Sequence, residues 1–370
     1  MTILFAAGGT GGHLYPAIAI AEEIKKRAPN AKIVFAGTKE KIEARVIPQK
    51  GFEFVTIWIS GFSRRLKIGN LLFPVKVVVS LFQSFFVIRK LKPSVVVGTG
   101  GYVCGPVLFV SSLLRIPTVV HESNSYPGVT TRMLAKRVTK VFLTFEATKK
   151  WISSKVNIEV VGNPTREELS SVTKEAGCKY FNLDPKKKTV FAFGGSLGSA
   201  SINAVMPDVI DDAIKNTYQV IWQTGESKAE TLKNFQKHDT IKVRRYMENI
   251  EFAYAAADMV VSRAGATTLA ELTRLGKPAI LVPYPHAAAN HQELNAQMMV
   301  DAGAAFMVRD GQLQEKLLPM IKELLMNEKL LREMGENSIK LGKPNAGSEI
   351  ADKIFAMSRL NRFFCLQSSC

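Results

Sequence analysis

Short apolar runs recur along the chain, and helix-like segments separate them. The first series of runs lies at residues 3–7, 33–36, 95–97, 118–120 and 141–143. After a polar stretch that ends at Lys188, a second series follows at residues 190–193, 220–222, 259–261 and 279–282. Short strands that alternate with helices are typical of parallel sheets. The pattern predicts an α/β fold of two Rossmann-like, doubly wound parallel-sheet domains facing a cleft, with the site at the carboxyl ends of the strands.

The length of 370 residues also favours two domains over one. The turn residues Gly162-Asn163-Pro164 separate the two series. We expect an N-terminal domain at 1–161 and a C-terminal domain at 162–345. A helix at about 346–360 is expected to pack back on the first domain, and 361–370 form a tail.

Positive charge is concentrated in the first half of the chain. The formal charge of +17 arises from 49 Lys and Arg against 32 Asp and Glu. Residues 1–160 carry 23 basic and 8 acidic residues, whereas 161–370 carry 26 and 24. The first half therefore predicts an anionic partner, nucleic acid or phospholipid. Because no nucleic-acid-recognition motif accompanies the charge, nucleic acid is the less favoured partner.

Compartment and cysteine usage narrow the protein class. The start of the chain has no basic segment before its short apolar run, and no run of 18 uncharged apolar residues occurs, so we expect a cytoplasmic protein. The four cysteines show neither a CxxC pair nor metal-ligand spacing, which predicts free thiols and no zinc site.

One segment, 68–88, is strongly apolar and rich in aromatic residues. Basic residues flank it, namely Arg64, Arg65 and Lys67 before it and Arg89, Lys90 and Lys92 after it. Pro74 and Lys76 within the run make a membrane-spanning helix improbable. An apolar patch with a basic rim favours docking on an anionic membrane surface. The alternative is that 77–88 is a buried core helix.

Three glycine loops follow predicted strands, at residues 8–13, 98–102 and 194–198. Glycine allows close backbone approach, and a helix that starts after the loop offers N–H groups to a phosphate. The first loop fails the dinucleotide pattern at Leu14, and the chain has no Walker A, HExxH or Asp-x-Asp motif. Backbone dipoles, hydroxyls and arginine, rather than a metal, would therefore meet a diphosphate.

The second half adds two polar helix starts. Residues 263–271, RAGATTLAE, place Glu271 one turn inside a helix, where it can accept hydrogen bonds from a ribose diol or simply complement the helix dipole. Residues 290–295, NHQELN, present amides suited to a hydroxyl-rich ligand, or form an ordinary polar helix entrance.

Taken in order, these motifs closely resemble one family, the MurG-type bacterial N-acetylglucosaminyltransferases. The match covers about residues 2–358 and runs through GGTGGHLYPA, GTGGYVCGP, HESNSYPG, VGNPTR, FGGSLGS, SRAGATTLAE and NHQELNA. The resemblance implies the glycosyltransferase-B architecture and an inverting hexosyl transfer. N-acetylglucosamine would move from UDP-N-acetylglucosamine, a substrate, to the 4-hydroxyl of the muramoyl sugar of lipid I, giving lipid II for peptidoglycan synthesis, without a cofactor or metal.

The resemblance also assigns site residues. The donor site would comprise Thr10, Gly11, Gly12, Asn124, Arg166, Ser196, Met247, Ala266, Thr267, Thr268, Leu269, Ala270, Glu271, Gln292 and Asn295. Arg166 and Ser196 would meet the diphosphate, and the backbone near Met247 would read uracil. Gly100, Gly101 and Tyr102 would hold the acceptor diphosphate. His13 is the favoured base for the acceptor hydroxyl. Glu122 is its rival, as base, acceptor ligand or partner that orients His13.

The resemblance further implies a peripheral protein on the cytoplasmic face of the cell membrane. Its expected partners are lipid I, anionic phospholipid and the cell-wall synthesis machinery that serves cell shape and division. Two alternatives share the architecture, a diacylglycerol glycosyltransferase and a UDP-N-acetylglucosamine 2-epimerase. The basic, aromatic segment at 64–92 disfavours the epimerase, which has no lipid acceptor.

Overall fold

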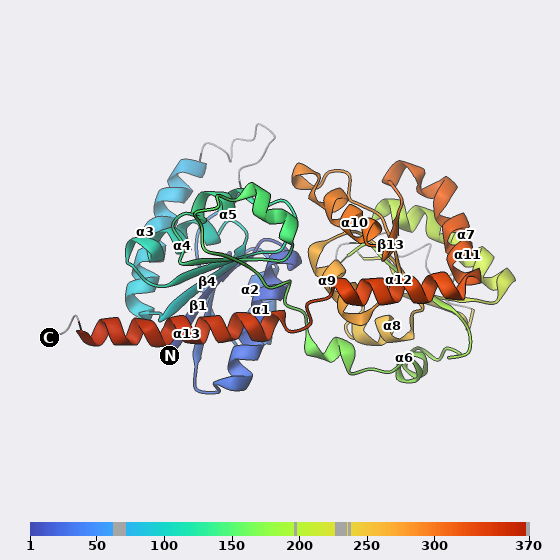
Figure 1. Ribbon diagram of the computed structural model, residues 1–370, viewed down its shortest axis with the longest axis horizontal. Helices are drawn as coiled ribbons and strands as arrows, with labels where there is room; N and C mark the ends of the chain where they lie inside the picture. Colours follow the sequence, from blue (N-terminus) through green and yellow to red (C-terminus); the bar gives the residue numbers. More distant parts are fainter. Residues whose placement is uncertain (62–71, 196–197, 226–234, 236–237, 368–370) are drawn as a thin grey trace. The chain divides into compact units, whose positions relative to one another are not determined.

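The structure is a computed structural model that describes residues 1–61, 72–195, 198–225, 235 and 238–367, with 360–367 described by their backbone alone. The chain forms two compact units, Met1–Thr165 with Pro344–Cys370, and Arg166–Lys343. Each unit is built on a parallel sheet with helices on both faces, so the predicted α/β fold class is confirmed (Figure 1).

The first unit contains a seven-stranded sheet among its described residues, in the order β3-β2-β1-β4-β5-β6-β7. The strands are β1 (Thr2–Ala7), β2 (Lys32–Gly37), β3 (Glu53–Thr56), β4 (Val95–Gly100), β5 (Thr118–Glu122), β6 (Lys140–Leu143) and β7 (Ile158–Val160). The helices are α1 (Gly11–Arg27), α2 (Ile42–Gln49), α3 (Phe73–Leu91), α4 (Cys104–Leu113), α5 (Val129–Leu134) and α13 (Ala346–Gln367).

Alternate residues of β1 enter opposite cores of this unit. Ile3 and Phe5 pack in the core that also contains α1 and α13, whereas Leu4 and Ala6 pack in the core that contains α4. Burial on both faces explains why the strand is a continuous apolar run rather than an alternating one. The C-terminal helix α13 lies along α1, where the side chain of Arg27 contacts Asp352 at 2.7 Å (Figure 1).

The second unit contains a six-stranded sheet among its described residues, in the order β10-β9-β8-β11-β12-β13. Its strands are β8 (Thr189–Phe193), β9 (Gln219–Gln223), β10 (Ile241–Arg244), β11 (Met259–Ser262), β12 (Ala279–Leu281) and β13 (Ala305–Met307). Its helices are α6 (Lys174–Phe181), α7 (Ala200–Asn216), α8 (Ile250–Ala256), α9 (Ala266–Leu275), α10 (His291–Asp301), α11 (Leu313–Met326) and α12 (Glu328–Leu341).

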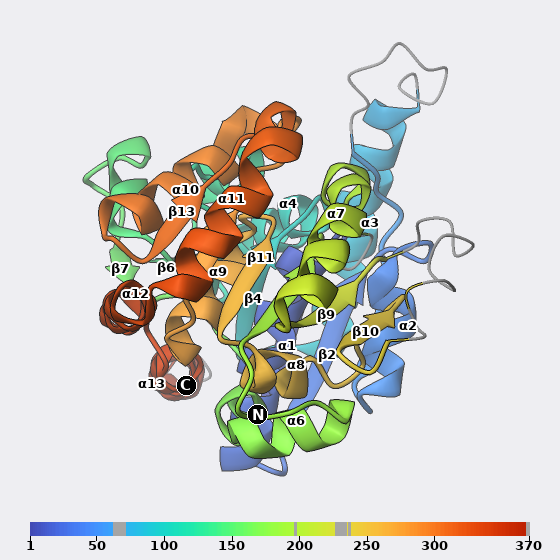
Figure 2. The ribbon, with the colours of Figure 1, turned by 90° about the vertical axis from the view of Figure 1, so that its right-hand side faces the viewer.

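The same two-faced burial recurs in β8. Val190 and Ala192 enter the core beneath α7 and α11, which lie together on one face of the sheet (Figure 2). Phe191 and Phe193 turn to the other face, where both rings meet Tyr254 of α8 edge-on.

Strand order reverses once in each sheet, between β1 and β4 and between β8 and β11. At such a reversal the connections leave in opposite directions, which opens a crevice at the carboxyl ends of the two strands. Two of the predicted glycine loops follow β1 and β8, and the third, at 98–102, begins inside β4, which extends to Gly100. The fold therefore places all three at these crevices.

Helix α3 exposes its aromatic residues and buries its serines. Ser80, Ser84 and Ile88 are the buried positions, spaced four apart along the side that packs on α4. The two hydroxyls donate to carbonyl groups of their own helix, Val77 and Ser80, so their burial leaves no unmet donor. Phe82 and Phe86 are 63% and 66% exposed. The side of the helix that bears the two serines is therefore buried, and the side that bears the aromatic residues is exposed.

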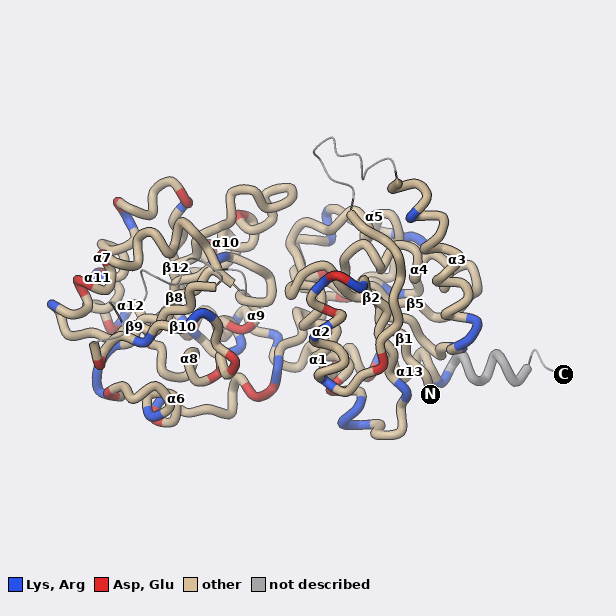
Figure 3. The backbone as a smooth tube through the Cα atoms, turned by 180° about the vertical axis from the view of Figure 1, so that it is seen from behind, with Lys and Arg blue, Asp and Glu red and all other residues tan. Residues whose placement is uncertain are grey.

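Basic residues flank the apolar stretch of α3, with Lys76 near its start and Arg89 and Lys90 in its last turn (Figure 3). Exposed Trp58 lies beside the helix, and the Lys76 ammonium is 5.6 Å from its ring centroid. The predicted basic residues Arg64, Arg65 and Lys67 lie outside the described residues. Across the described ranges, no helix has the length and hydropathy needed to cross a membrane.

Candidate functional site

In the first unit, the glycine loops after β1 and β4 are in direct backbone contact. A Cβ added to Gly101 would lie 2.2 Å from the carbonyl oxygen of Gly8, and the φ angle of Gly101 is +86°. Only glycine fits both the space and the conformation. The Thr99 hydroxyl adds a 2.7 Å hydrogen bond to the carbonyl of His13. The two predicted loops therefore form one structure at the β1–β4 crevice.

His13 lies in the first turn of α1 with its ring against the second loop. A Cβ at Gly100 would lie 2.3 Å from His13 Nδ1, so the missing side chain makes room for the imidazole. His13 is half-buried, and its neighbours Thr10, Gly11 and Gly12 form the loop end and helix start. Such a helix start presents N–H groups to an anion beside the ring.

Cys104 stabilises the second glycine loop through hydrogen bonds of its thiol. Its buried Sγ donates to the carbonyl of Ala6 at 2.8 Å and accepts from the N–H of Gly100 at 3.1 Å. Burial raises the pKa of this thiol to about 12, so it stays protonated and can donate. Exposed Tyr102 follows the loop, and its ring covers Gly61.

Glu43 is a buried carboxylate that sequence reasoning did not identify. One of its oxygens accepts from the N–H of Gly9 at 3.0 Å, and the other accepts from the N–H and the hydroxyl of Thr38 at 3.0 and 2.7 Å. It therefore ties the first glycine loop to the end of β2. No acidic residue stands at the end of β2, and Glu43 of α2 takes that place from further along the chain. A glutamate in the first turn of a helix is common, so the local sequence does not indicate that Glu43 contacts the glycine loop.

Glu122, at the end of β5, has both carboxylate oxygens engaged. It accepts hydrogen bonds from the Asn124 backbone and amide groups, from the Gly128 N–H at 2.9 Å and from the Thr131 hydroxyl at 2.6 Å. These contacts order the loop that carries Asn124. Next to it, the Nε2–H of fully buried His121 donates to the carbonyl of Gly162 at 2.9 Å, and burial lowers the pKa of His121. The charges of His13 and Glu122 both act on His121, which places the three residues in one region.

In the second unit, Glu271 contacts two polar side chains. It accepts from the Tyr254 hydroxyl at 2.8 Å, and its other oxygen lies 4.0 Å from Arg166 Nη2. Burial raises the pKa of the Glu271 carboxyl, and the charge of Arg166 and the Tyr254 hydrogen bond oppose this shift. The structure thus brings Arg166 and Glu271 together, and Tyr254 is a further member that sequence reasoning missed.

The first turn of α9 lies at the β11 side of the crevice. It contains Ala266, Thr267 and Thr268, followed by Leu269 and Ala270. The buried Thr267 hydroxyl has no hydrogen-bond partner among the described residues. A buried hydroxyl without a partner costs stability unless a ligand or water completes it, so this turn is suited to a polar ligand.

Two loops around this turn are braced by side chains. The Arg263 guanidinium contacts the Asp310 carboxylate, donates to Ser201 Oγ at 2.8 Å and donates to the carbonyl groups of Val282 and Pro283. Buried Asn295 donates to the carbonyl of Ala264 at 3.1 Å. Arg263 opens the 263–271 motif but was given no role from the sequence, and Asp310 was not identified from it.

The remaining predicted donor-site residues are Gln292, Met247 and Ser196. Gln292 accepts from the N–H of Tyr284 at 3.0 Å, and the N–H of buried Met247 donates to Gln223 at 2.8 Å. Ser196 lies outside the described residues. The adjoining Gly198 approaches the carbonyl of Thr224 so closely that a Cβ would lie 2.2 Å away. Among the described residues, no group of three or more His, Cys, Asp or Glu side chains is placed to hold a metal ion.

Both units match models of one protein family. Residues 3–143 match the glycosyltransferase family 28 N-terminal domain, and residues 189–350 match the family 28 C-terminal domain. Curated relatives are named "UDP-N-acetylglucosamine--N-acetylmuramyl-(pentapeptide) pyrophosphoryl-undecaprenol N-acetylglucosamine transferase". One from a Thermoanaerobacter species is 43% identical over 357 residues, covering 95% of this chain and 98% of the relative. One from Flavobacterium psychrophilum is 38% identical, covering 96% and 97%.

A solved structure agrees with these matches. The crystal structure of Acinetobacter baumannii MurG is 27% identical, with a TM-score of 0.75 over 96% of this chain and 99% of that one. Near-complete coverage on both sides means that the resemblance extends over both units and their order. The chain therefore belongs to glycosyltransferase family 28, among the MurG-type N-acetylglucosamine transferases.

Proposed function

We propose that this glycosyltransferase moves N-acetylglucosamine from UDP-N-acetylglucosamine to the 4-hydroxyl of the muramoyl sugar of lipid I, and so makes lipid II for peptidoglycan synthesis. The observation that carries the proposal is the full-length identity of 43% and 38% to relatives named for this transfer. Those names favour it over a 2-epimerase or a diacylglycerol glycosyltransferase.

The second unit would hold the nucleotide. Glu271 accepts hydrogen bonds from the ribose hydroxyls, and Arg166 meets the diphosphate together with Ser196 and the helix N-terminus at Ala266. Their 4.0 Å separation supports the assignment, since adjacent ribose and phosphate groups need adjacent partners. Because the N–H of Met247 is donated to Gln223, uracil is read by neighbouring backbone groups. Gln292 contacts the diphosphate or sugar, and Asn295 positions Ala264 from beneath.

His13 is the proposed base. Its ring accepts the proton of the 4-hydroxyl as that oxygen attacks the anomeric carbon, the bond to the UDP β-phosphate breaks, and the configuration inverts. Glu122 is assigned a positioning role, because all four hydrogen bonds that it accepts serve its own loop. Thr10, Gly11, Gly12 and Asn124 are assigned to the donor sugar.

The glycine loop after β4 would receive the diphosphate of the acceptor. Backbone N–H groups in a tight loop can meet an anion without a side chain. The Gly100 N–H already donates to Cys104 Sγ, so the backbone N–H groups of Gly101 and Tyr102 would bind the acceptor diphosphate. No metal or cofactor is part of this proposal.

The exposed face of α3 would dock on the cytoplasmic leaflet, where lipid I is presented. Each exposed Phe side chain that inserts into the membrane contributes about 2 kcal/mol to the free energy of binding, and each nearby Lys or Arg adds about 1 kcal/mol on an anionic surface. The cell-wall synthesis machinery would be met at the same membrane.

The reaction is tested by measuring UDP release with and without a soluble lipid I analogue. We expect release only with the analogue, a loss of about a thousandfold in kcat for His13→Ala, and a smaller loss for Glu122→Gln that keeps the wild-type pH profile. Acceptor-independent release with formation of N-acetylmannosamine would contradict the proposal and favour the epimerase. A greater loss in Glu122→Gln than in His13→Ala would transfer the role of base to Glu122.

Docking is tested with vesicles that contain anionic phospholipid. The double change Phe82→Ser and Phe86→Ser should weaken binding at least about tenfold, because two exposed apolar side chains are removed. Turnover of the soluble analogue should stay unchanged. Met326→Ser, an 81% exposed apolar residue in the second unit, is the matched control. Equal vesicle binding by all three proteins would exclude α3 as the docking face.

A further inference from the structure

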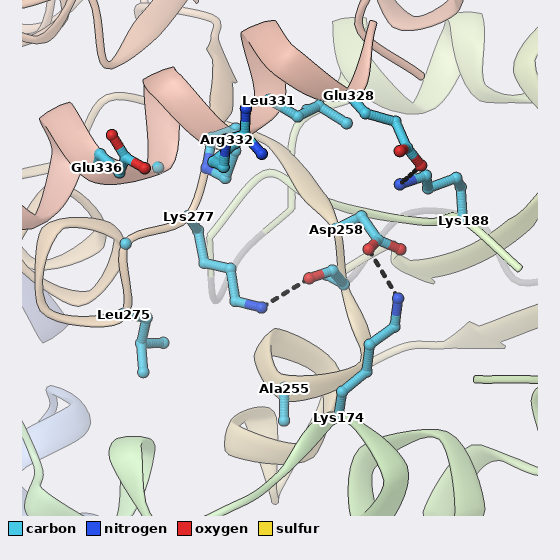
Figure 4. Close-up of a pocket in the computed structure, with 14 residues that line it drawn as sticks. Lys174, Lys188, Ala255, Asp258, Leu275, Lys277, Glu328, Leu331, Arg332 and Glu336 are labelled. Carbon is cyan, nitrogen blue, oxygen red and sulfur yellow. Dashed lines mark hydrogen bonds and ion pairs between the residues drawn. The ribbon is translucent and has the colours of Figure 1, made fainter. Parts of the chain in front are cut away.

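A cavity of about 540 Å³ lies at the amino-terminal edge of the second sheet (Figure 4). Lys188 precedes β8, Asp258 precedes β11, and Lys277 stands two residues before β12. The donor loops follow the carboxyl ends of β8 and β11, which are the opposite ends of these parallel strands. The cavity is therefore separate from the nucleotide site of the same unit.

Helix α12 forms one wall of the cavity, and two glycines set its distance from the sheet. A Cβ at Gly335 would lie 2.8 Å from the carbonyl oxygen of Gly276, the residue that ends α9 with a φ of +61°. This close approach leaves no room for a side chain between the helix and the turn. It places Arg332 of α12 and Lys277 on the lining of one cavity.

Four cationic side chains line the cavity, and in the described part of the chain two of them form ion pairs with carboxylates. Lys174 contacts Asp258 at 2.7 Å, and Lys188 contacts Glu328 at 2.8 Å. Among the described residues, no ion pair involves the other two cations, Lys277 and Arg332, or the carboxylate of Glu336.

Lys277 is the more constrained of these two cations. Its ammonium donates to the backbone carbonyl of Ala257 at 2.6 Å, while Lys174 approaches the adjoining Asp258 (Figure 4). Burial lowers the pKa of Lys277 to about 8; the Asp258 charge opposes this shift and that of Lys174 adds to it. A nearby anion would lower the free energy of the charged form.

We propose that this cavity binds a small dianionic oxyanion of the phosphate class, free or as a monoester, between Arg332 and Lys277. The guanidinium presents paired N–H donors that match two oxygens of a tetrahedral anion, and the ammonium supplies a point charge. The carboxylates of Asp258 and Glu328 each have their own lysine, and Glu336 is the carboxylate that opposes the ligand. Four lining cations against three lining carboxylates still favour an anion.

Sulfate is the first probe, because its charge stays constant from pH 7 to 9.5. Calorimetric titration at fixed ionic strength should give saturable binding that Arg332→Gln weakens at least about tenfold. Lys277→Met should weaken it similarly, and this change is compatible with folding because it removes a charge that is costly to bury. The matched control Lys329→Gln, an exposed lysine on α12 outside the lining, should bind as wild type.

A second control separates this cavity from the nucleotide site. Arg166→Gln should leave sulfate affinity unchanged; if it alone removed binding, the anion would sit at the donor loops and the proposal would be overturned. Wild-type affinity in Arg332→Gln and Lys277→Met, or no saturable binding at all, would overturn it as well. Inorganic phosphate and glycerol phosphate at pH 7 then tell the free anion from the monoester by which binds more tightly.

The pH dependence gives an independent check. The charged and titratable groups around Lys277 are Lys174 and Cys178 of α6, Lys188 and Asp258 before the strands, and Glu328, Arg332 and Glu336 of α12. Burial raises the Cys178 pKa above 9.0. Lys277, with its pKa of about 8, should lose its proton between pH 7 and 9.5, and sulfate affinity should fall several-fold as it does. Lys277→Met should show a clearly smaller fall, and a fall as large as that of wild type would contradict the assignment.

Discussion

The candidate sites of the two units differ in what forms them, backbone contacts in the first and polar side chains in the second. In the first unit, backbone contacts backbone, as at Gly101 and Gly8, and a buried carboxylate, Glu43, holds the loop from behind. In the second unit, charged and hydroxyl side chains make the candidate site, with Glu271 between Arg166 and Tyr254. The first arrangement fixes shape, and the second sets charge and hydrogen-bonding capacity.

This difference predicts different responses to substitution. A site made of close backbone contacts tolerates no added atom, because backbone cannot move aside without disturbing the sheet. A site made of side chains can lose one group and keep its fold. Changes at the backbone contacts of the first unit should therefore reduce stability and activity together, whereas changes at the side chains of the second unit should affect them separately.

The largest effect should come from Gly101→Ala. The new Cβ would lie 2.2 Å from the Gly8 carbonyl oxygen at a φ of +86°, so we expect a loss of about 3 kcal/mol in the free energy of unfolding by urea, together with loss of activity. Gly105→Ala is the matched control, since its Cβ would meet only a methyl group of Thr130 at 4.0 Å and helical alanine is favourable. Equal stability of the two variants would contradict the backbone account.

A smaller effect is expected from Glu43→Gln. The amide keeps the size of the carboxylate but turns a donor toward an N–H group, so about 2 kcal/mol of stability should be lost and kcat should fall about tenfold. Urea unfolding and UDP release measure the two quantities. Glu40→Gln, at an exposed position nearby, should match wild type in both. Unchanged kcat in Glu43→Gln would show that the loop keeps its position without this anchor.

The smallest effect on stability, with the opposite sign, is expected from Glu271→Gln. Burial raises the pKa of this carboxyl above its ordinary 4.5, so its contribution to stability is full below about pH 4.5 and is lost as the pH rises through the raised value. Glutamine resembles the protonated form. The variant should melt at a higher temperature than wild type at pH 8, with the gap closing toward pH 4, while UDP-N-acetylglucosamine binding weakens about tenfold.

Exposed Glu323→Gln is the control for this titration and should show no such pH-dependent gap. A Glu271→Gln protein that melts below wild type at pH 8 would mean that the Tyr254 and Arg166 contacts outweigh the cost of burying the charge.

The sequence identified the central strands well and the outer ones poorly. Runs such as 3–7 and 190–193 are buried on both faces and therefore read as continuous apolar stretches. The strands β3, β7, β10 and β13 were not predicted, because they are short and lie at the sheet edges. The first three also mix polar with apolar residues, whereas β13 is apolar but only three residues long. For α3, the apolar run could not distinguish core from surface, although Ser80, Ser84 and Ile88 at spacings of four mark its buried side.

The sequence nominates candidate site residues that stand close to glycine motifs, and it does not nominate residues that contact these candidates from elsewhere in the chain. His13 and Glu271 stand inside recognisable motifs. Glu43 contacts Gly9 across 34 positions, and Tyr254 contacts Glu271 from a different helix. Such contacts depend on how helices pack on the sheet, which no local pattern specifies.

The most direct test of the division of labour compares nucleotide binding with turnover in two variants. Calorimetry with UDP-N-acetylglucosamine and release of UDP with a lipid I analogue should be measured for wild type, His13→Ala and Glu271→Ala. The account predicts that His13→Ala binds the nucleotide with wild-type affinity but does not turn it over, and that Glu271→Ala loses affinity at least about tenfold. Wild-type affinity in Glu271→Ala, or full turnover in His13→Ala, would contradict it.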